Sequence, residues 1–195
     1  MSLGSSLRTI LQIIGGLAVA AVVAGAVYVG LFMPGRGFSA KDDPSQLEEL
    51  IARRARALAT PAGTKEMKNP HPVTEEGLAA ARAHWVDHCA TCHALDGSGQ
   101  TSIGQNLYPK APDMRAEATQ KLTDGELYSI IENGIRFTGM PAWGTEHSAE
   151  DNWQLVMLIR RLPKLSPEEL KEMEKLAAAK GGGHTHTPGT PPHKD

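Results

Sequence analysis

Apolar residues are concentrated near the N-terminal end of this chain. From Ile10 to Met33 the sequence runs for 24 residues without a charge. As a helix this run would be about 36 Å long, enough to cross the hydrocarbon core of a membrane with some tilt. A cleaved signal peptide is the alternative, because small residues occur at positions 24–26, although its apolar region is shorter, about 7–15 residues. We expect a short flank at residues 1–9 and an uncleaved transmembrane anchor at residues 10–33.

After residue 33, apolar positions return with helical spacing. Ser45 and Glu48 form a capping box, which predicts the start of a helix. The helix has apolar residues on one face, at Leu47, Leu50, Ile51 and Leu58, and arginines largely on the other, at Arg53, Arg54 and Arg56. We place it in a spacer covering residues 34–73. Three positions stay open for this helix: on the following domain, on the membrane surface or on a partner.

Three more helices are predicted in a domain of residues 74–163. The first begins at Thr74, where two acidic residues in the first turn favour the helix dipole. Its apolar face carries four residues at helical spacing, Leu78, Ala81, Trp85 and Cys89. Capping signals at Thr123 and Ser148 begin the other two. The closing helix is apolar on two sides, so we expect it to be buried.

The remaining segments carry weaker patterns. Asp96 to Met114 is rich in Gly, Pro and Asn, which predicts a long loop. No stretch alternates apolar and polar residues as a strand would, so the predicted fold class is all-α. Ser166, followed by a proline, begins a charged helix in residues 164–180. We expect disorder in residues 181–195, where metal binding is the alternative for the histidines His184, His186 and His193.

Both cysteines of the chain lie in one short run, Cys89-Ala90-Thr91-Cys92-His93. A C-x-x-C-H run is typical of the covalent attachment of c-type haem. The two thiols are about one helical turn apart and can reach the same porphyrin, and the histidine directly after them points its imidazole at the iron. We therefore expect one haem c, attached through both cysteines and ligated by His93.

Other uses of this run are weaker. A thioredoxin-like dithiol needs a strand–motif–helix setting, whereas the residues before Cys89 look helical. A zinc site needs two further ligands, for which only scattered histidines are present. Free thiols of a tethered redox or metal chaperone stay open as an alternative, and labelling of the thiols would separate that function from haem attachment.

A methionine loop lies 47 residues after His93. Met140 stands between Gly139 and Pro141, which predicts a loop rather than a helix interior. A methionine thioether is a usual sixth ligand of an electron-carrying c-type haem, and it raises the reduction potential. We expect Met140 to be the distal iron ligand, with Met114 as the serious competitor.

The order of these motifs resembles that of a class I cytochrome c: C-x-x-C-H near the start, a "GMPAW" loop ending at Trp143, and a closing helix. The resemblance covers about residues 73–163. It implies an all-α domain around one covalently bound haem. An aromatic residue four positions before the first cysteine, here Trp85, should pack against the last helix, which here contains Trp153.

The resemblance also implies roles for residues around the haem. A proline carbonyl that accepts a hydrogen bond from the iron-binding histidine corresponds to Pro112, 19 residues after that histidine. Met114 takes the place of an apolar residue that packs on the haem, and Trp143 lies in the haem site with the methionine loop. Arg115 and Arg136 are candidates to pair with the haem propionates.

The predicted domain is acidic. Residues 74–163 hold 7 Lys and Arg against 12 Asp and Glu, a net charge of −5. This balance gives no support to nucleic-acid binding and favours redox protein partners with basic docking surfaces. The charges that flank the N-terminal anchor do not orient it. Because bacteria attach the haem of this family outside the cytoplasmic membrane, the resemblance implies an inner-membrane protein with its domain in the periplasm.

Taken together, these patterns predict a membrane-tethered carrier of single electrons in a respiratory or photosynthetic chain. We do not expect an enzyme, since no group of general acid, base and nucleophile is apparent; the protein could still be a subunit of an oxidoreductase complex. One alternative stays open. A displaceable Met140 would leave the sixth iron position to a diatomic gas or peroxide, which would give a haem-based sensor or a peroxidase.

Overall fold

The computed structural model describes residues 3–36 and 39–181, and all regular elements in these two ranges are helical. The all-α prediction is therefore confirmed. The chain divides into two compact units, Met1–Asp42 and Asp43–Asp195. The predicted disorder of residues 181–195 falls almost entirely outside the described residues.

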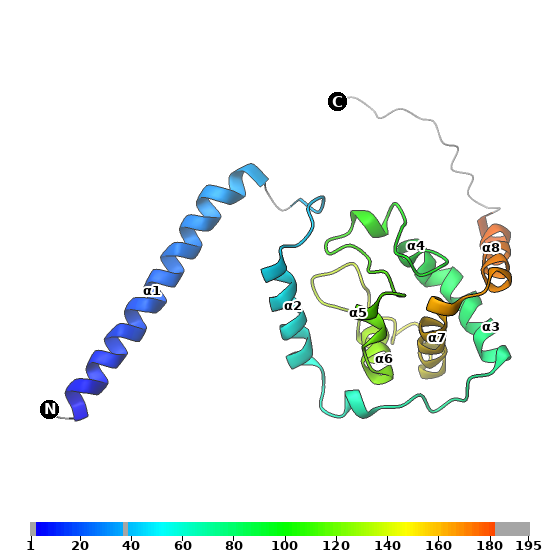
Figure 1. Cartoon of the computed structure of the whole chain (residues 1–195), viewed down its shortest axis with the longest axis horizontal. Helices are drawn as coiled ribbons and strands as arrows, with labels where there is room; N and C mark the ends of the chain where they lie inside the picture. Colours follow the sequence, from blue (N-terminus) through cyan, green and yellow to red (C-terminus); the bar gives the residue numbers. More distant parts are fainter. Residues whose placement is uncertain (1–2, 37–38, 182–195) are drawn as a thin grey trace. The chain divides into compact units, whose positions relative to one another are not determined.

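The first unit is built on one long helix, α1 (Leu3–Arg36), drawn in blue in Figure 1. Its segment Ser6–Leu31 has a mean hydropathy of 2.3, and none of that window is buried. By length and composition this helix can cross a membrane, which makes it compatible with the predicted single-pass anchor. A signal sequence near the N-terminus would meet the same criterion.

The second unit contains seven α-helices among the described residues: α2 (Gln46–Ala59), α3 (Glu75–His84), α4 (Ala90–His93), α5 (Glu117–Gln120), α6 (Asp124–Asn133), α7 (Ala149–Arg161) and α8 (Pro167–Gly181). A π-helical turn, Trp85–Cys89, joins α3 to α4. Short 3-10 turns lie at Thr64–Glu66, Gly104–Asn106 and Leu162–Lys164.

Helix α2 begins as the sequence predicts but leaves its apolar face uncovered. The Glu48 amide donates to Ser45 Oγ at 3.3 Å, and the Ser45 amide donates to Glu48 Oε2 at 2.7 Å, which completes the capping box. Leu47 is 64 % exposed and Leu58 is 87 % exposed. The apolar residues of α2 therefore do not pack on the domain of residues 74–163. The contact with that domain is polar: the Tyr108 hydroxyl donates to Glu48 Oε1 at 3.0 Å.

The other predicted start signals also form. Thr74 Oγ1 accepts the amide of Gly77 at 3.0 Å at the start of α3. Thr123 and Ser148 each complete a capping box, at α6 and α7 respectively. Gly134 ends α6 with a φ of 63°, a backbone conformation that favours glycine.

Helix α7 is the centre of the hydrophobic core. Leu155, Val156, Leu158 and Ile159 are at most 2 % exposed, and α7 contacts both α3 and α6. Trp85, directly after α3, and Trp153 of α7 belong to the same buried cluster, as the resemblance implies. Burying such large aromatic side chains contributes strongly to the stability of a small domain.

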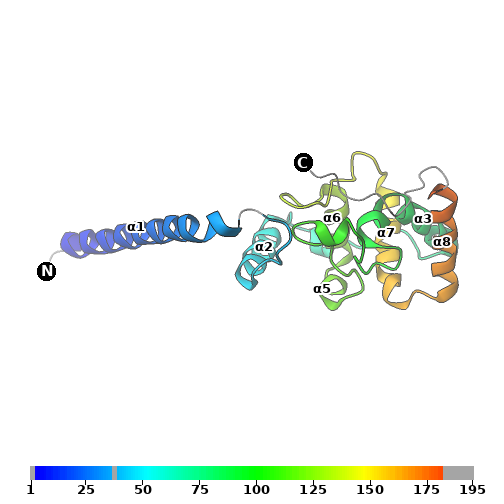
Figure 2. The same ribbon diagram turned by 90° about the horizontal axis from the view of Figure 1, so that it is seen from above.

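Helix α8 adds to this core. Figure 2 shows α3, α7 and α8 side by side. Met173 of α8 has no exposed surface and joins the same cluster. Glu169 binds Arg161 through two hydrogen bonds of 3.0 Å and lies 3.6 Å from Arg82 of α3. The charged helix after residue 163 is thus packed against α3 and bonded to the end of α7.

Candidate haem site

One nearly continuous helical segment carries the C-x-x-C-H run. Helix α3 leads through the π-helical turn into α4, so that Cys89 ends the turn while Cys92 and His93 lie on α4. Both cysteines are partly exposed and unbridged. The structure therefore brings these three predicted haem-binding residues together at one end of a helix, within reach of a single ligand. π-helical turns are often found at functional sites.

The His93 ring is partly buried and lies beside the Pro112 carbonyl. Its Nδ1 is buried and lacks a hydrogen bond of standard geometry, although the Pro112 carbonyl is close enough to raise the pKa of the imidazole. Burial, the larger effect, lowers that pKa below its usual value, so the ring is neutral at pH 7. A neutral imidazole with one nitrogen directed at a carbonyl is the form that ligates metals. The His93 ring, with Nδ1 near the Pro112 carbonyl, and the two neighbouring thiols fit a haem c.

The loop after His93 is fastened to the haem-binding helix. The Gly99 amide donates to the His93 carbonyl at 2.9 Å, and Thr101 Oγ1 donates to the Cys92 carbonyl at 3.2 Å. A Cβ at Gly104 would collide with that same Cys92 carbonyl. The loop thus lies directly against α4, which explains why position 104 requires a glycine.

The methionine loop is held by backbone hydrogen bonds. The Met140 carbonyl accepts the Ile135 amide at 3.1 Å, and the Met140 amide donates to Thr138 Oγ1 at 3.1 Å. The Trp143 amide donates to the carbonyl of Ile131 in α6 at 3.0 Å. Met140 itself is only partly buried. A backbone fixed in this way suits a distal ligand, whose thioether must be held at one position.

Other methionines occupy less suitable places. Met157 is 6 % exposed within α7, and its Cε lies against α3 near Gly77. Met67 is in the spacer and is 38 % exposed. Met114 packs against the core cluster, and its carbonyl accepts Gln120 Nε2 at 2.8 Å. Met114 therefore packs on the protein core, and its contact with the haem stays a prediction.

The two predicted propionate partners differ in their surroundings. Arg115 lies 2.8 Å from Asp96 and 2.9 Å from Asp113, and it lowers the pKa of Asp113 through their hydrogen bond. Arg136 is exposed just before the methionine loop. Trp143, predicted to lie in the haem site, stacks on His147 with ring centroids 4.7 Å apart.

Thiol chemistry fits this site poorly. Burial raises the pKa of the Cys89 thiol to about 12. Since the thiolate is the nucleophile and the metal-binding form of cysteine, a free Cys89 would be almost wholly protonated at pH 7. This argues against the dithiol alternative.

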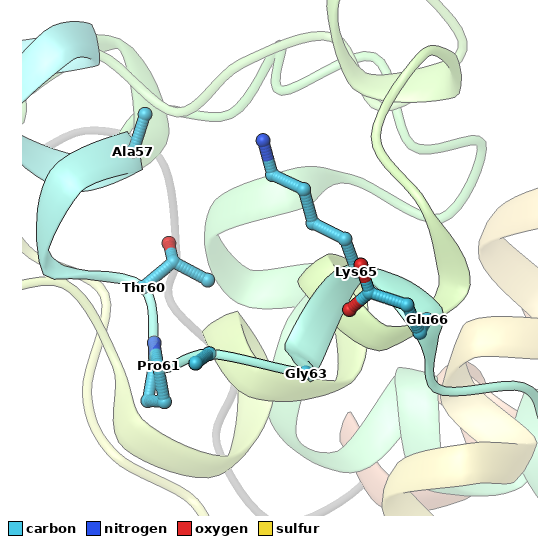
Figure 3. Close-up of a pocket in the computed structure, with 7 residues that line it drawn as sticks. Ala57, Thr60, Pro61, Gly63, Lys65 and Glu66 are labelled. Atoms are coloured by element: carbon cyan, nitrogen blue, oxygen red, sulfur yellow. The ribbon is translucent and has the colours of Figure 1, made fainter.

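An open hollow in the spacer is separate from this site. Figure 3 shows the residues that line it, Ala57, Thr60, Pro61, Ala62, Gly63, Lys65 and Glu66. None of the predicted haem-site residues is among them. Lys65 lies 3.7 Å from the Glu126 carboxylate, so its charge is already partly balanced.

Comparison with known families decides the class of the domain. Residues 76–159 match the family described as cytochrome c oxidase, cbb3-type, subunit III. These residues form a class I c-type cytochrome domain. The match spans the C-x-x-C-H run, the methionine loop and most of α7. It establishes haem c, covalently attached, as the cofactor of the cytochrome domain, and haem-based electron transfer as its general function.

More distant similarity was found among solved structures. A chain of the Kuenenia stuttgartiensis reducing HAO-like protein complex Kustc0457/Kustc0458 is 20 % identical, with a TM-score of 0.43. The match covers 49 % of this cytochrome chain and 49 % of that chain, so it spans about half the length of each. A comparison with curated proteins found no match.

Proposed function

We propose that this cytochrome passes single electrons between redox proteins of a respiratory or photosynthetic chain, with its haem iron held by His93 and Met140. The observation that carries the proposal is the presence, in one domain, of a C-x-x-C-H run on the π-helical turn and α4 and of a methionine loop with a fixed backbone. A His/Met-ligated haem c supplies a reversible one-electron couple of raised potential. Helix α4 holds His93 and backbone hydrogen bonds hold the loop at Met140, which minimises rearrangement during transfer.

The surrounding residues support the two ligands in different ways. The Pro112 carbonyl faces the His93 ring and orients it. The hydrogen bonds of Thr138 and Ile135 hold the backbone at Met140. Thioether linkages from Cys89 and Cys92 keep the cofactor in the domain through both oxidation states.

We also propose a location and a kind of partner. Helix α1 would anchor the protein in the cytoplasmic membrane by a single span, with the cytochrome domain in the periplasm, where haem is attached. The domain's net charge of −5 over residues 74–163 favours partners with basic docking surfaces, and association should slow as salt is added. No substrate transformation by the protein alone is proposed; it can serve as the electron-transfer component of an oxidoreductase complex.

Optical spectroscopy of ligand variants tests the iron ligation. Ferric protein should show the weak near-infrared thioether band of His/Met haem, and Met140→Ala should abolish it while leaving the haem covalently attached. Met114→Ala is the matched control and should keep the band. Loss of the band in Met114→Ala instead would refute the assignment of Met140. Rapid binding of carbon monoxide by the unaltered ferrous protein would favour the sensor or peroxidase alternative.

A further inference from the structure

Three histidines outside the haem site gather on one side of the cytochrome domain. His84 is the last residue of α3, His88 lies in the π-helical turn, and His147 immediately precedes the cap of α7. Each offers a ring nitrogen, and these three nitrogen atoms all lie within 4.8 Å of one another. Nε2 of His84 and Nε2 of His147 are 2.9 Å apart.

We propose that His84, His88 and His147 form a binding site for a divalent transition-metal ion, Zn²⁺ or Cu²⁺, distinct from the haem iron. Imidazole nitrogen suits both ions. In a tetrahedral site with bonds of about 2.0–2.1 Å, ligand nitrogens are roughly 3.3 Å apart. The three rings approach that spacing already, so small side-chain rotations close the site. A fourth position stays open to water.

A chain of hydrogen bonds orients the His147 ring and fixes which of its nitrogens carries the proton. Asn152 has no exposed surface, and its Nδ2 donates to Glu132 Oε2 at 2.8 Å. The carboxylate of Glu132 can only accept, which fixes the orientation of the amide. Asn152 Oδ1 must then accept from His147 Nδ1 at 3.1 Å. The proton of His147 therefore sits on Nδ1, and Nε2 offers its lone pair to the cluster. Outer hydrogen bonds of this kind fix ligand histidines in metal sites.

The electrostatic surroundings favour a bound cation over protonated rings. Burial and, next, the neighbouring His147 lower the pKa of His84. With its lone pair, His147 Nε2 accepts the hydrogen bond of His84 Nε2; on metal binding that proton would move to His84 Nδ1 or be released. Asp151 lies 3.9 Å from His84 Nδ1, and Glu132 lies behind Asn152. Bringing three imidazolium ions together would be costly, whereas one divalent ion would satisfy all three nitrogens and meet two nearby carboxylates.

The three histidines lie beside the segment that carries the haem cysteines and beside the methionine loop. His88 directly precedes Cys89, and Trp143 of the methionine loop lies 5.2 Å from the His88 ring and 4.7 Å from the His147 ring, between centroids. A metal held here would therefore tie His147, whose amide donates to the Trp143 carbonyl at 2.8 Å, to the helical segment that carries the haem cysteines.

Calorimetric titration of the full, haem-bearing chain in detergent tests the site. Protein purified without a polyhistidine tag should bind one equivalent of Zn²⁺ at pH 7. His88→Ala removes an exposed ligand and should weaken binding at least tenfold, while its optical spectrum reports an intact haem domain. His71→Ala, a histidine outside the cluster, is the control and should bind as the unaltered protein does. Equal affinity in His88→Ala would overturn the proposal.

A second arm separates this site from the histidines near the C-terminus. A chain ending at Gly181 lacks His184, His186 and His193 and should retain the one-equivalent site; its loss on truncation would refute the proposal. Electron paramagnetic resonance of the Cu²⁺-loaded truncated chain should show three equatorial nitrogen ligands, reduced to two in its His88→Ala variant. An unchanged nitrogen count in that variant would also contradict the assignment.

Discussion

The indole Nε1 of Trp85 donates a 2.9 Å hydrogen bond to the carbonyl of Ala94, the residue directly after His93. This bond joins Trp85, directly after α3, to the residue at which the chain leaves α4. At Ala94 the backbone turns sharply, with φ 62° and ψ 165°. That region is almost restricted to glycine, and other residues adopt it at a cost of about 1–3 kcal/mol.

Replacing Ala94 with glycine should stabilise the cytochrome domain. Glycine relieves the strain, and its greater freedom in the unfolded chain offsets part of the gain, so we expect about 1 kcal/mol, or roughly 4–8 °C in the midpoint of thermal unfolding. Ala90→Gly is the matched control: Ala90 has helical dihedral angles, and the change should lower stability by a similar amount. A lower midpoint in Ala94→Gly would show that the turn carries no strain.

Helix starts in this chain could be predicted because their signals are local. Ser45, Thr74, Thr123 and Ser148 each bind an amide three residues further on, so the pattern in the sequence is itself the contact. The C-x-x-C-H run is equally local. The predictions for these elements needed no knowledge of which helix packs on which.

Contacts between distant segments could not be predicted in this way. Met173 shares a helix face with Leu170 and Leu176, a spacing that indicates an apolar face but not which helix covers it or that Met173 is fully buried. Gln120 joins the Met114 carbonyl to the Ile159 carbonyl of α7, a bridge across 39 residues. His147 and His84 meet across 63 residues, so the sequence offered them only as scattered histidines.

Docking of the spacer on α6 can be tested with a pair of glycines. A Cβ at Gly125, in the first turn of α6, would collide with the Thr64 backbone carbonyl of the spacer. Gly125→Ala should therefore destabilise the domain by about 1–3 kcal/mol. Gly77, in the first turn of α3, has its nearest obstacles at 3.2 Å and 3.5 Å, both side-chain atoms, so Gly77→Ala should be close to neutral. Equal midpoints of chemical unfolding for the two variants would contradict the docking.

Acid should weaken the contact between α7 and α8. The two hydrogen bonds from Arg161 are the main cause that lowers the pKa of Glu169 from 4.5 to about 2. Because the pKa is lowered on folding, the stabilisation is fully present above pH 4.5, the value for the unfolded chain, and is lost as the pH falls toward about 2.

Thermal unfolding midpoints across pH 2–6 would measure this contribution, with the pH range chosen to span both pKa values. Glu169→Gln should be less stable than the unaltered protein at pH 6, and the difference should shrink below pH 4.5. Glu168→Gln, at the exposed neighbouring position, should follow the unaltered protein throughout. A constant difference between Glu169→Gln and the unaltered protein would exclude a charged contact.

The cytochrome domain should depend on its haem for folding. A domain of about 90 residues buries a smaller fraction of its surface on folding than a larger domain does, and a covalent porphyrin would add a large apolar body to its core. A Cys89→Ala, Cys92→Ala double variant cannot attach haem, and we expect its domain to be largely unfolded. Hydrogen exchange in detergent measures this: amides of α7 should lose protection, whereas those of α1, in a separate unit, should keep it as an internal control. Native-like protection of α7 without haem would show that the helices alone are sufficient to form the core.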